Sequence, residues 1–386
     1  MQIVQTLLEG LFNGVSIGAV LLVASLGLAI VFGLMGVINM AHGEFMMLGA
    51  YATFVVQNFC KGTPLAPIYI LLALPIAFLL TAGFGVVLER GVIRHLYGRP
   101  LETLLATWGV SLILQQFVRS VNWVMAAGIV IFCLLFFGGL WLLGRRPGYA
   151  QIKAWAWAVL MPLSAAISFV TGFAMAQTFK LVVTKPWFGA QNVDVTAPAW
   201  LRGGIRLGTF QLPYARLFII ALTISCVVGV YWFLQKSRWG LRIRSVTQNR
   251  AMSSCLGIPT ARVDALTFAI GSGLAGVAGC AISLLGSVGP NTGQNYVVDT
   301  FMVVVVGGVG KLVGSIVAAI AIGTVNYFIG SGTIALMLQP IKPAFDLFTF
   351  FATTSMAKVM VFALIIVFLQ FRPGGIFPQK GRTVDA

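Results

Sequence analysis

Two short stretches interrupt the apolar sequence with residues that could do chemistry. The first, Met35–Glu44, reads MGVINMAHGE and contains four polar or small residues of interest: Asn39, His42, Gly43 and Glu44. Ionisable groups at membrane depth are energetically expensive, which favours a functional role facing the protein interior. A structural role stays equally open, because the dipole of a helix stabilises a carboxylate in its first turn. These four residues are the candidate substrate pathway.

The second stretch, Val306–Gly314, reads VGGVGKLVG and has four glycines in nine residues. A phosphate-binding loop needs G-x-x-x-x-G-K followed by Ser or Thr. Here Leu312 follows Lys311, and Val305 stands where the first glycine should be, so no nucleotide site is predicted in this chain. Broken helices near the membrane midplane mark transport pathways. Short turns at the membrane face are the alternative explanation for both stretches.

The other reactive side chains form no metal or catalytic set in the sequence. There are two histidines and no HExxH motif, and the five cysteines are scattered without a CxxC pair. With no nucleophile and base at matched positions, we expect neither an enzyme nor a metal or cofactor site. The net charge of +16 comes from Lys and Arg in short loops, which is typical of an oriented membrane protein and argues against nucleic-acid binding.

Apolar runs extend along almost the whole chain. The structure that they form must hold the two polar stretches in place. Hydrophobic residues make up 59% and charged residues 9%, whereas soluble proteins carry about 25% charged residues. Many runs approach the roughly 20 residues that span a bilayer, where only helices satisfy their backbone internally. The sequence predicts an all-α transmembrane bundle, a single transmembrane domain over residues 1–386, with about 11 spans: 10–34, 43–59, 67–88, 102–118, 123–143, 155–179, 215–235, 263–286, 297–310, 312–330 and 354–371.

The distribution of Lys and Arg sets the expected orientation. The loops that follow 67–88, 123–143 and 215–235, together with the C-terminal tail, are rich in both residues. Placing these four segments inside also places Lys311 inside, which puts 16 of the 25 Lys and Arg residues inside and leaves 9 outside. We therefore expect the N-terminus outside and the C-terminus inside.

The longest polar segment on the inside is the loop 236–262. Its centre, Asn249–Ile258, predicts a short amphipathic helix that Gly257 ends and Pro259 cannot continue. One face of this helix is apolar and the other polar: Ala251, Cys255 and Leu256 against Asn249 and Arg250. Such a helix could lie on anionic lipid, or it could insert into the groove of a partner protein.

Several long blocks resemble the permeases of the branched-chain amino acid class of ABC importers: VINMAHGEFMMLGAY, ERGVIRHLYGRPLETLLATWGVSLILQQ, NRAMSSCLGI and FRPGGIFPQKGR. Within that class, LYGRPLETLLATWGVSLILQQ, WFGAQNVDVTAPAWLRGG and FPQKGR are most similar to the urea (short-chain amide) branch. The resemblance covers nearly the whole chain except about 121–185.

This resemblance implies a multi-pass subunit of the bacterial inner membrane without an ATPase site of its own. The implied partners are a second related permease, two cytoplasmic subunits that use ATP, and a periplasmic solute-binding protein. By matching position, the family's ATPase-coupling loop falls on Asn249, Arg250, Ala251, Cys255, Leu256, Gly257 and Ile258. The family's first signature matches Asn39–Glu44.

The segment 121–185 departs from the family pattern. It contributes two apolar runs around a basic loop, Arg145–Lys153, and an even number of spans preserves the orientation of everything downstream. We expect an inserted transmembrane hairpin at the periphery, added to about nine family spans. An accessory docking element is the alternative.

For the cargo, the sequence favours urea or a related short-chain amide. Neither glycine-containing stretch has an Arg that could hold a carboxylate, and unpaired charge at depth is costly. A branched-chain amino acid is the alternative cargo. A stand-alone secondary transporter or channel is the alternative of a different class. Secondary transport commonly needs ionisable groups in the spans, and Glu44, Asp264 and Asp299 are the few candidates, with no obvious basic partner mid-span.

Overall fold

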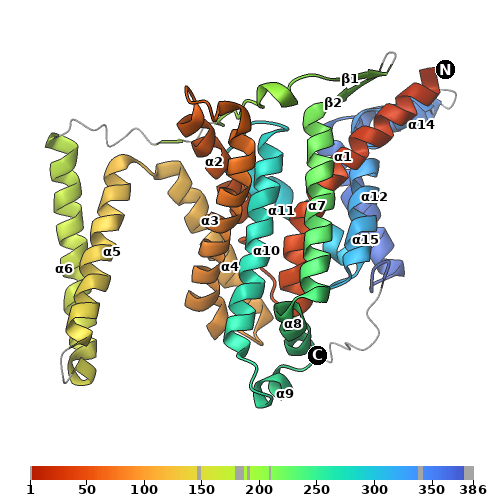
Figure 1. The fold of residues 1–386 in the computed structure, drawn as a ribbon. Helices are drawn as coiled ribbons and strands as arrows, with labels where there is room; N and C mark the ends of the chain where they lie inside the picture. The colour runs from red at the N-terminus through yellow and green to blue at the C-terminus, as the bar shows by residue number, and fades with distance from the viewer. Residues whose placement is uncertain are drawn as a thin grey trace. The chain divides into compact units, whose positions relative to one another are not determined.

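The computed structural model describes residues 2–145, 149–178, 187–188, 192–207, 210–337 and 342–377 (Figure 1). Its contacts divide the chain into two compact units. The core unit consists of Met1–Leu112 and Val193–Ala386, and the second unit is Ile113–Asn192. The helix α4 (Pro100–Ser120) begins in the core unit and ends in the second.

Helices make up most of the core unit. They are α1 (Gln2–Ile30), continued by a π-helical turn (Val31–Met35), α2 (His42–Cys60), α3 (Tyr69–Gly91), α7 (Tyr214–Lys236), α8 (Arg238–Gln248), α9 (Arg250–Cys255), α10 (Thr260–Ser283), α11 (Thr292–Gly307), α12 (Leu312–Gly330), α13 (Thr333–Met337), α14 (Lys342–Phe351) and α15 (Thr354–Phe371). Single 3₁₀ turns occupy Ala66–Ile68, Ile93–His95 and Ala199–Leu201. An antiparallel hairpin, β1 (Gly204–Leu207) and β2 (Phe210–Pro213), pairs Gly204 with Pro213. The hairpin and α9 lie at opposite ends of the core unit (Figure 1).

Each of the eleven predicted spans coincides with a helix, which confirms the prediction of an all-α membrane protein. In the part of the chain that the structure describes, eight helices are long and apolar enough to cross a membrane. The helices α2, α11 and α15 are more polar or shorter. Two of them, α2 and α11, begin inside the bundle, as the site geometry below shows.

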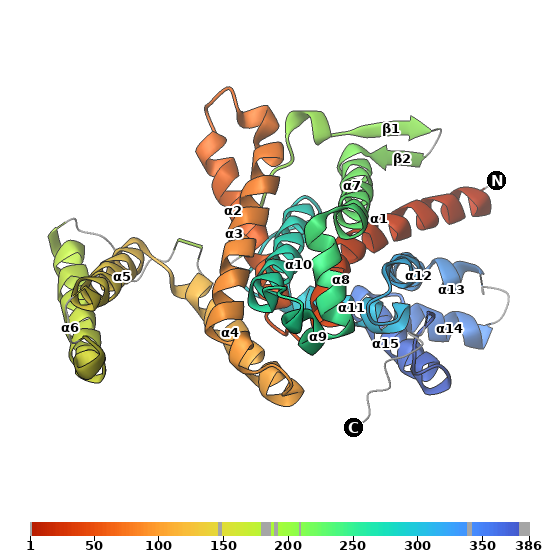
Figure 2. The same ribbon diagram turned by 60° about the horizontal axis from the view of Figure 1, so that its bottom comes forward.

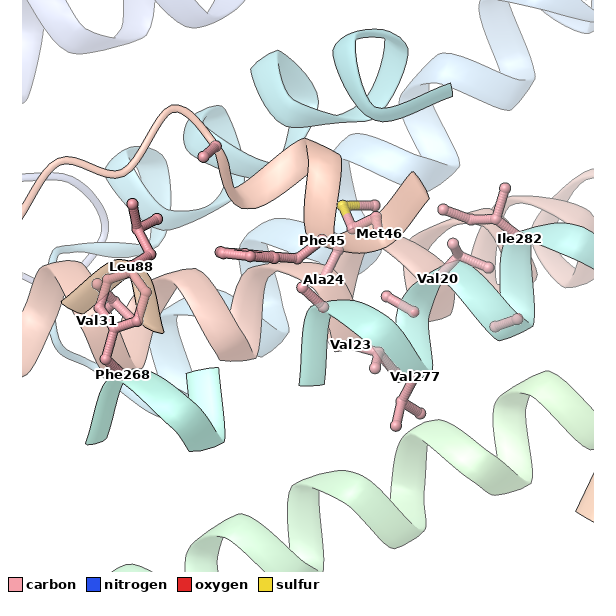
Figure 3. Close-up of a cluster of buried hydrophobic side chains, with 14 of the residues drawn as sticks. Val20, Val23, Ala24, Val31, Phe45, Met46, Leu88, Phe268, Val277 and Ile282 are labelled. Carbon is pink, nitrogen blue, oxygen red and sulfur yellow. The ribbon is translucent and has the colours of Figure 1, made fainter. Parts of the chain in front are cut away.

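The centre of the core unit is α10, which packs against α1, α2 and α3 (Figure 2). Small residues allow the close approach that membrane helices use in place of a hydrophobic driving force. A Cβ at Gly49 of α2 would collide with the carbonyl oxygen of Gly276 of α10, and a Cβ at Gly276 would collide with Thr81 and the carbonyl oxygen of Ala77 on α3, so both positions require glycine. Larger apolar side chains fill the remaining space, and Figure 3 shows Phe45 and Met46 beside Ala24 in this cluster.

The second unit contains α5 (Trp123–Gly144) and α6 (Tyr149–Thr178), which pack against each other. The Asn122 side chain begins α5 by accepting a hydrogen bond from the amide of Met125 at 2.7 Å. Phe136 of α5 meets Trp157 of α6 edge to face, with ring centroids 5.2 Å apart. Both apolar runs of the predicted insertion are therefore helical. Its peripheral position stays a prediction, and 179–186 lie outside the described residues.

Candidate substrate pathway and coupling loop

The first polar stretch leaves the end of α1 and returns to the middle of the bundle. Gly36 adopts φ +69°, which ends the π-helical turn and redirects the chain. Six residues later, the His42 Nε2 atom lies 2.9 Å from the carbonyl oxygen of Ala24, well inside α1. At the same level, Gly27 of α1 lies against Gly271, a central residue of α10. The helix α2 therefore begins at mid-depth.

The start of α11 lies at the same place. A Cβ at Gly43 would collide with the carbonyl oxygen of Gly293, and a Cβ at Gly293 would collide with that of Gly43. These glycines lie in the first turns of α2 and α11, so the N-termini of two helices meet in the interior. The first amides of a helix have no partner within the helix and carry partial positive charge. The amides of His42, Glu44 and Thr292 donate to the carbonyls of Asn39, Ala41 and Gly289 in the preceding turns, and the positive ends of both helix dipoles point at the junction.

Glu44 lies beside this junction in the first turn of α2, and its side chain is buried. Its Oε1 atom accepts a hydrogen bond from the Ser111 hydroxyl at 3.0 Å. The two roles considered for Glu44 are compatible in this geometry, because the carboxylate is favoured by the helix dipole and also faces the interior. Which role it has in transport stays a prediction.

Two hydroxyls that contact the start of α2, those of Thr107 and Ser111, come from α4, a helix that the sequence analysis did not single out. Thr103, Thr107 and Ser111 recur every four residues and are all buried. The Thr107 hydroxyl accepts from the amide of Met40 at 3.1 Å and donates to the carbonyl of Leu104 at 3.0 Å. The sequence signal that could have identified these residues is their spacing of four on an apolar helix, because residues at i and i+4 share one helix face.

Asn39 shapes the chain just before α2. Its Oδ1 atom accepts from the amide of Ala41 at 3.1 Å, as in an Asx turn. Its Nδ2 atom is buried, and so is the Nδ1 atom of His42; neither has a hydrogen-bond partner among the described residues. Buried polar atoms normally have partners, so these two groups could meet a passing polar solute. The four candidate residues therefore contact different elements: Asn39 its own turn, His42 α1, Gly43 α11, and Glu44 the Ser111 hydroxyl of α4. Their role in a substrate pathway stays a prediction.

The second glycine-rich stretch forms a turn at the ends of two helices. Gly308 and Gly310 adopt φ +97° and +79° between α11 and α12. The amide of Ile376 donates to the carbonyl of Val306 at 2.8 Å, so the C-terminal segment covers the turn. A Cβ at Gly33 would collide with Gly310, which places this turn at the end of α1. The turn alternative therefore fits the second stretch, whereas the first reaches mid-depth.

The expectation about the buried carboxylates needs correction. Asp299 of α11 forms an ion pair with Lys358 of α15, with Oδ2 and Nζ 2.9 Å apart. The same ammonium group donates to the carbonyl of Asn295 at 3.1 Å. Asp264 pairs with Arg250 at 2.6 Å. The expectation was wrong because the partners are distant in sequence and only packing brings them together.

The predicted amphipathic helix is α9. The Asn249 side chain begins it by accepting from the amide of Met252 at 2.9 Å. Gly257 ends it at φ +79°, with the amide of Ile258 donating to the carbonyl of Ser253 at 3.0 Å, as in a Schellman motif. The structure adds α8, a second amphipathic helix that the sequence treated as part of the loop.

Every residue of the predicted coupling set except Ile258 is exposed. The apolar residues of α9 are exposed: Ala251, Met252, Cys255 and Leu256. Leu256 is 75% exposed and Met252 59% exposed, so this chain leaves an apolar face uncovered. Ile258 instead packs on the cluster formed by Ile243, Val246 and Val263.

The Arg250 side chain is about half exposed, but its guanidinium contacts buried groups of the bundle. Its guanidinium pairs with Asp264, whose side chain is 5% exposed, and lies 4.4 Å from the centroid of the Tyr97 ring. The Tyr97 hydroxyl donates to Glu89 Oε1 at 3.4 Å. Burial raises the pKa of Tyr97, and the carboxylates of Asp264 and Glu89 raise it further, so the phenol keeps its proton. Four residues thus fasten the start of α9 to α3 and α10.

A helical bundle with two helix starts meeting at mid-depth has the architecture of a membrane transport protein. The chain belongs to the family described as the permease component of the branched-chain amino acid transport system, which it matches over residues 10–369. Together with the eight long apolar helices, this membership makes the chain a multi-pass protein of the inner membrane.

Curated relatives cover nearly the whole chain. The high-affinity branched-chain amino acid transport system permease protein BraD of Pseudomonas aeruginosa is 25% identical over 96% of this chain and 95% of its own. LivH of Escherichia coli K12, of the same description, is 25% identical over 96% and 94%. The ribose import permease protein RbsC of Bacillus subtilis is 29% identical over 28% of this chain and 35% of its own. No solved structure matches.

Proposed function

We propose that this chain is the membrane-spanning permease subunit of an ATP-driven (ABC) importer whose cargo is a branched-chain amino acid. The relatives BraD and LivH are named for that cargo. This supports a branched-chain amino acid, which the sequence analysis gave as the alternative to urea. The observation that carries the proposal is the meeting of α2 and α11 at Gly43 and Gly293. Broken helices whose N-termini converge at mid-depth bind anionic substrate groups in transporters.

Urea was favoured because neither glycine-containing stretch has an arginine that could hold a carboxylate. The junction of α2 and α11 removes that objection to an amino acid. The positive ends of the α2 and α11 dipoles can stabilise the carboxylate of an amino acid without an arginine. The buried Glu44 carboxylate, held by Ser111, can pair with the ammonium group. Both charges of a zwitterion would then be matched at depth, which avoids the cost of an unpaired buried charge.

Urea or a short-chain amide is the second candidate cargo. The unpartnered Asn39 Nδ2 atom and the hydroxyls of Thr107 and Ser111 suit a small neutral solute with donors and acceptors. The blocks that resemble the urea branch support the same candidate. Asn39→Leu keeps roughly the side-chain volume and removes the amide, so it should lower urea uptake more than leucine uptake.

ATP enters through partner subunits in this proposal. The exposed apolar face of α9 would dock in a groove of a cytoplasmic ATPase, and Arg250 would fix the helix to the bundle. Two ATPases, a second related permease and a periplasmic solute-binding protein would complete the importer, as the resemblance implies.

The test is uptake by the complete complex in proteoliposomes, with labelled leucine and labelled urea in parallel. We expect leucine uptake that requires ATP and the solute-binding protein. ATP-dependent uptake of urea with none of leucine would replace the first cargo by the second. Uptake by this chain alone, driven by an ion gradient or by no energy source, would refute the importer and indicate a secondary transporter or channel.

A further inference from the structure

An apolar groove runs between α7 and α10 on the core unit. Its volume is about 420 Å³, and every lining side chain is apolar. Cys226, Val230 and Phe233 of α7 face Ile270 and Leu274 of α10 across it, and Ile243 of α8 closes one end. The groove therefore begins inside the bundle and ends beside α8.

The length of the groove matches one leaflet of a bilayer. Along α10 the lining residues run from Leu266 to Val277, a distance of about 16 Å at roughly 1.5 Å per residue. Half of the roughly 30 Å hydrocarbon core is nearly the same length. A groove of this length and polarity fits an acyl chain lying along the protein.

Positive charge is concentrated on and just before α8, the helix whose Ile243 lines the groove. Lys236 and the arginines of α8 lie within nine residues, and no Asp or Glu occurs between 195 and 263: Lys236, Arg238, Arg242 and Arg244. Arg238 and Arg242 are exposed, and the Arg242 guanidinium lies 4.8 Å from the centroid of the Trp239 ring. Arg244 donates to Gln235 at 2.8 Å. Exposed Trp and Arg side chains are typical of the headgroup layer, where basic clusters attract anionic lipid.

We propose that the groove binds one acyl chain of an anionic phospholipid, with its headgroup phosphate on Arg238 and Arg242 of α8. The apolar walls select a lipid tail, and the uncompensated charge at the end selects an anionic headgroup over a zwitterionic one. The lipid would occupy the space between α7 and α10 and contact α8, which leads directly into α9. This site is independent of the cargo and of ATP use.

The first test fills the groove. Gly229 of α7 lines the groove and is exposed, and a Cβ there meets nothing within 4 Å, so Gly229→Leu adds bulk to the groove. Gly83→Leu on α3 is the matched control, because Gly83 is equally open and exposed. Binding of phosphatidylglycerol and phosphatidylethanolamine to the purified full chain is measured by native mass spectrometry. We expect wild type and Gly83→Leu to prefer phosphatidylglycerol, and Gly229→Leu to bind it at least tenfold more weakly.

The second test removes the charge. The double variant Arg238→Gln/Arg242→Gln should lose at least threefold of the preference for phosphatidylglycerol, whereas Arg206→Gln, exposed on β1, should keep it. Unchanged binding in Gly229→Leu and in the arginine variant overturns the proposal. So does loss of the second permease from Gly229→Leu with lipid binding intact, because the groove would then be a subunit interface.

A measurement on the wild-type chain guards against variants that fail to fold. Cys226 lines the groove, whereas Cys133 and Cys255 are exposed elsewhere. Added phosphatidylglycerol should slow alkylation of Cys226 by N-ethylmaleimide at least threefold relative to phosphatidylethanolamine, with the rates at Cys133 and Cys255 unchanged. Equal rates at Cys226 in the two lipids would overturn the proposal.

Discussion

Replacing Arg250 by glutamine should release α9 from the bundle without unfolding the membrane helices. The Arg250 side chain is 47% exposed, and its partner Asp264 is 5% exposed. Removing one partner of a fully buried ion pair costs roughly 3–5 kcal/mol, whereas an exposed pair contributes about 0–1 kcal/mol. Because the Arg250 side chain is half exposed, the expected cost of removing it lies between these limits, at about 2 kcal/mol. That value corresponds to a roughly thirty-fold change in an equilibrium constant.

Hydrogen exchange measures this release directly, because amides report the local opening of the segment that contains them. In Arg250→Gln, the amides of α9 should exchange about thirty-fold faster, while those in the middle of α10 keep their wild-type rates. Arg262→Gln is the matched control, since Arg262 is an exposed arginine of the same loop. In the complete complex, Arg250→Gln should retain ATP hydrolysis and lose most uptake.

A double-mutant cycle with Asp264→Asn separates the pair from other effects. Asp264→Asn leaves no buried charge behind, so it should cost less than Arg250→Gln, and the double variant should cost less than the sum. Unchanged exchange of α9 in Arg250→Gln, or strict additivity in the cycle, would refute the argument. Arg250→Glu would disrupt this internal pair in addition to any contact with a partner, so that variant alone does not test docking.

Three further outcomes follow from the same geometry. Leu256→Asp should abolish ATP-dependent uptake with an unchanged melting temperature, because Leu256 is exposed at the end of α9. Leu241→Asp on α8 is the control, and equal uptake in both variants would exclude α9 as the docking face. Ser111→Ala should lower the free energy of unfolding by roughly 1–3 kcal/mol by removing the donor to Glu44, and an unchanged melting curve would contradict this. Deleting 123–184 should keep the C-terminus inside and retain much of the uptake; cysteine labelling that finds the C-terminus outside would refute the expected topology.

Local features of the sequence were enough to place the helices. Apolar runs of bilayer length must be helical, whichever neighbours they meet, because the backbone has no other partner in hydrocarbon. Neighbouring residues also determine where α9 begins and ends. Asn249 begins the helix through its own side chain, and Gly257 ends it in a conformation that glycine adopts without strain.

The depth at which a helix begins was decided only by the tertiary structure. Nothing near His42 in the sequence indicates that it reaches Ala24, or that Gly43 meets Gly293, because these contacts depend on how α1, α2 and α11 pack. The direction of a side chain was decided in the same way. Arg250 belongs to the polar face of α9 in any sequence pattern, yet it points inward because α10 brings a buried carboxylate within 2.6 Å of it, and a buried charge requires a partner.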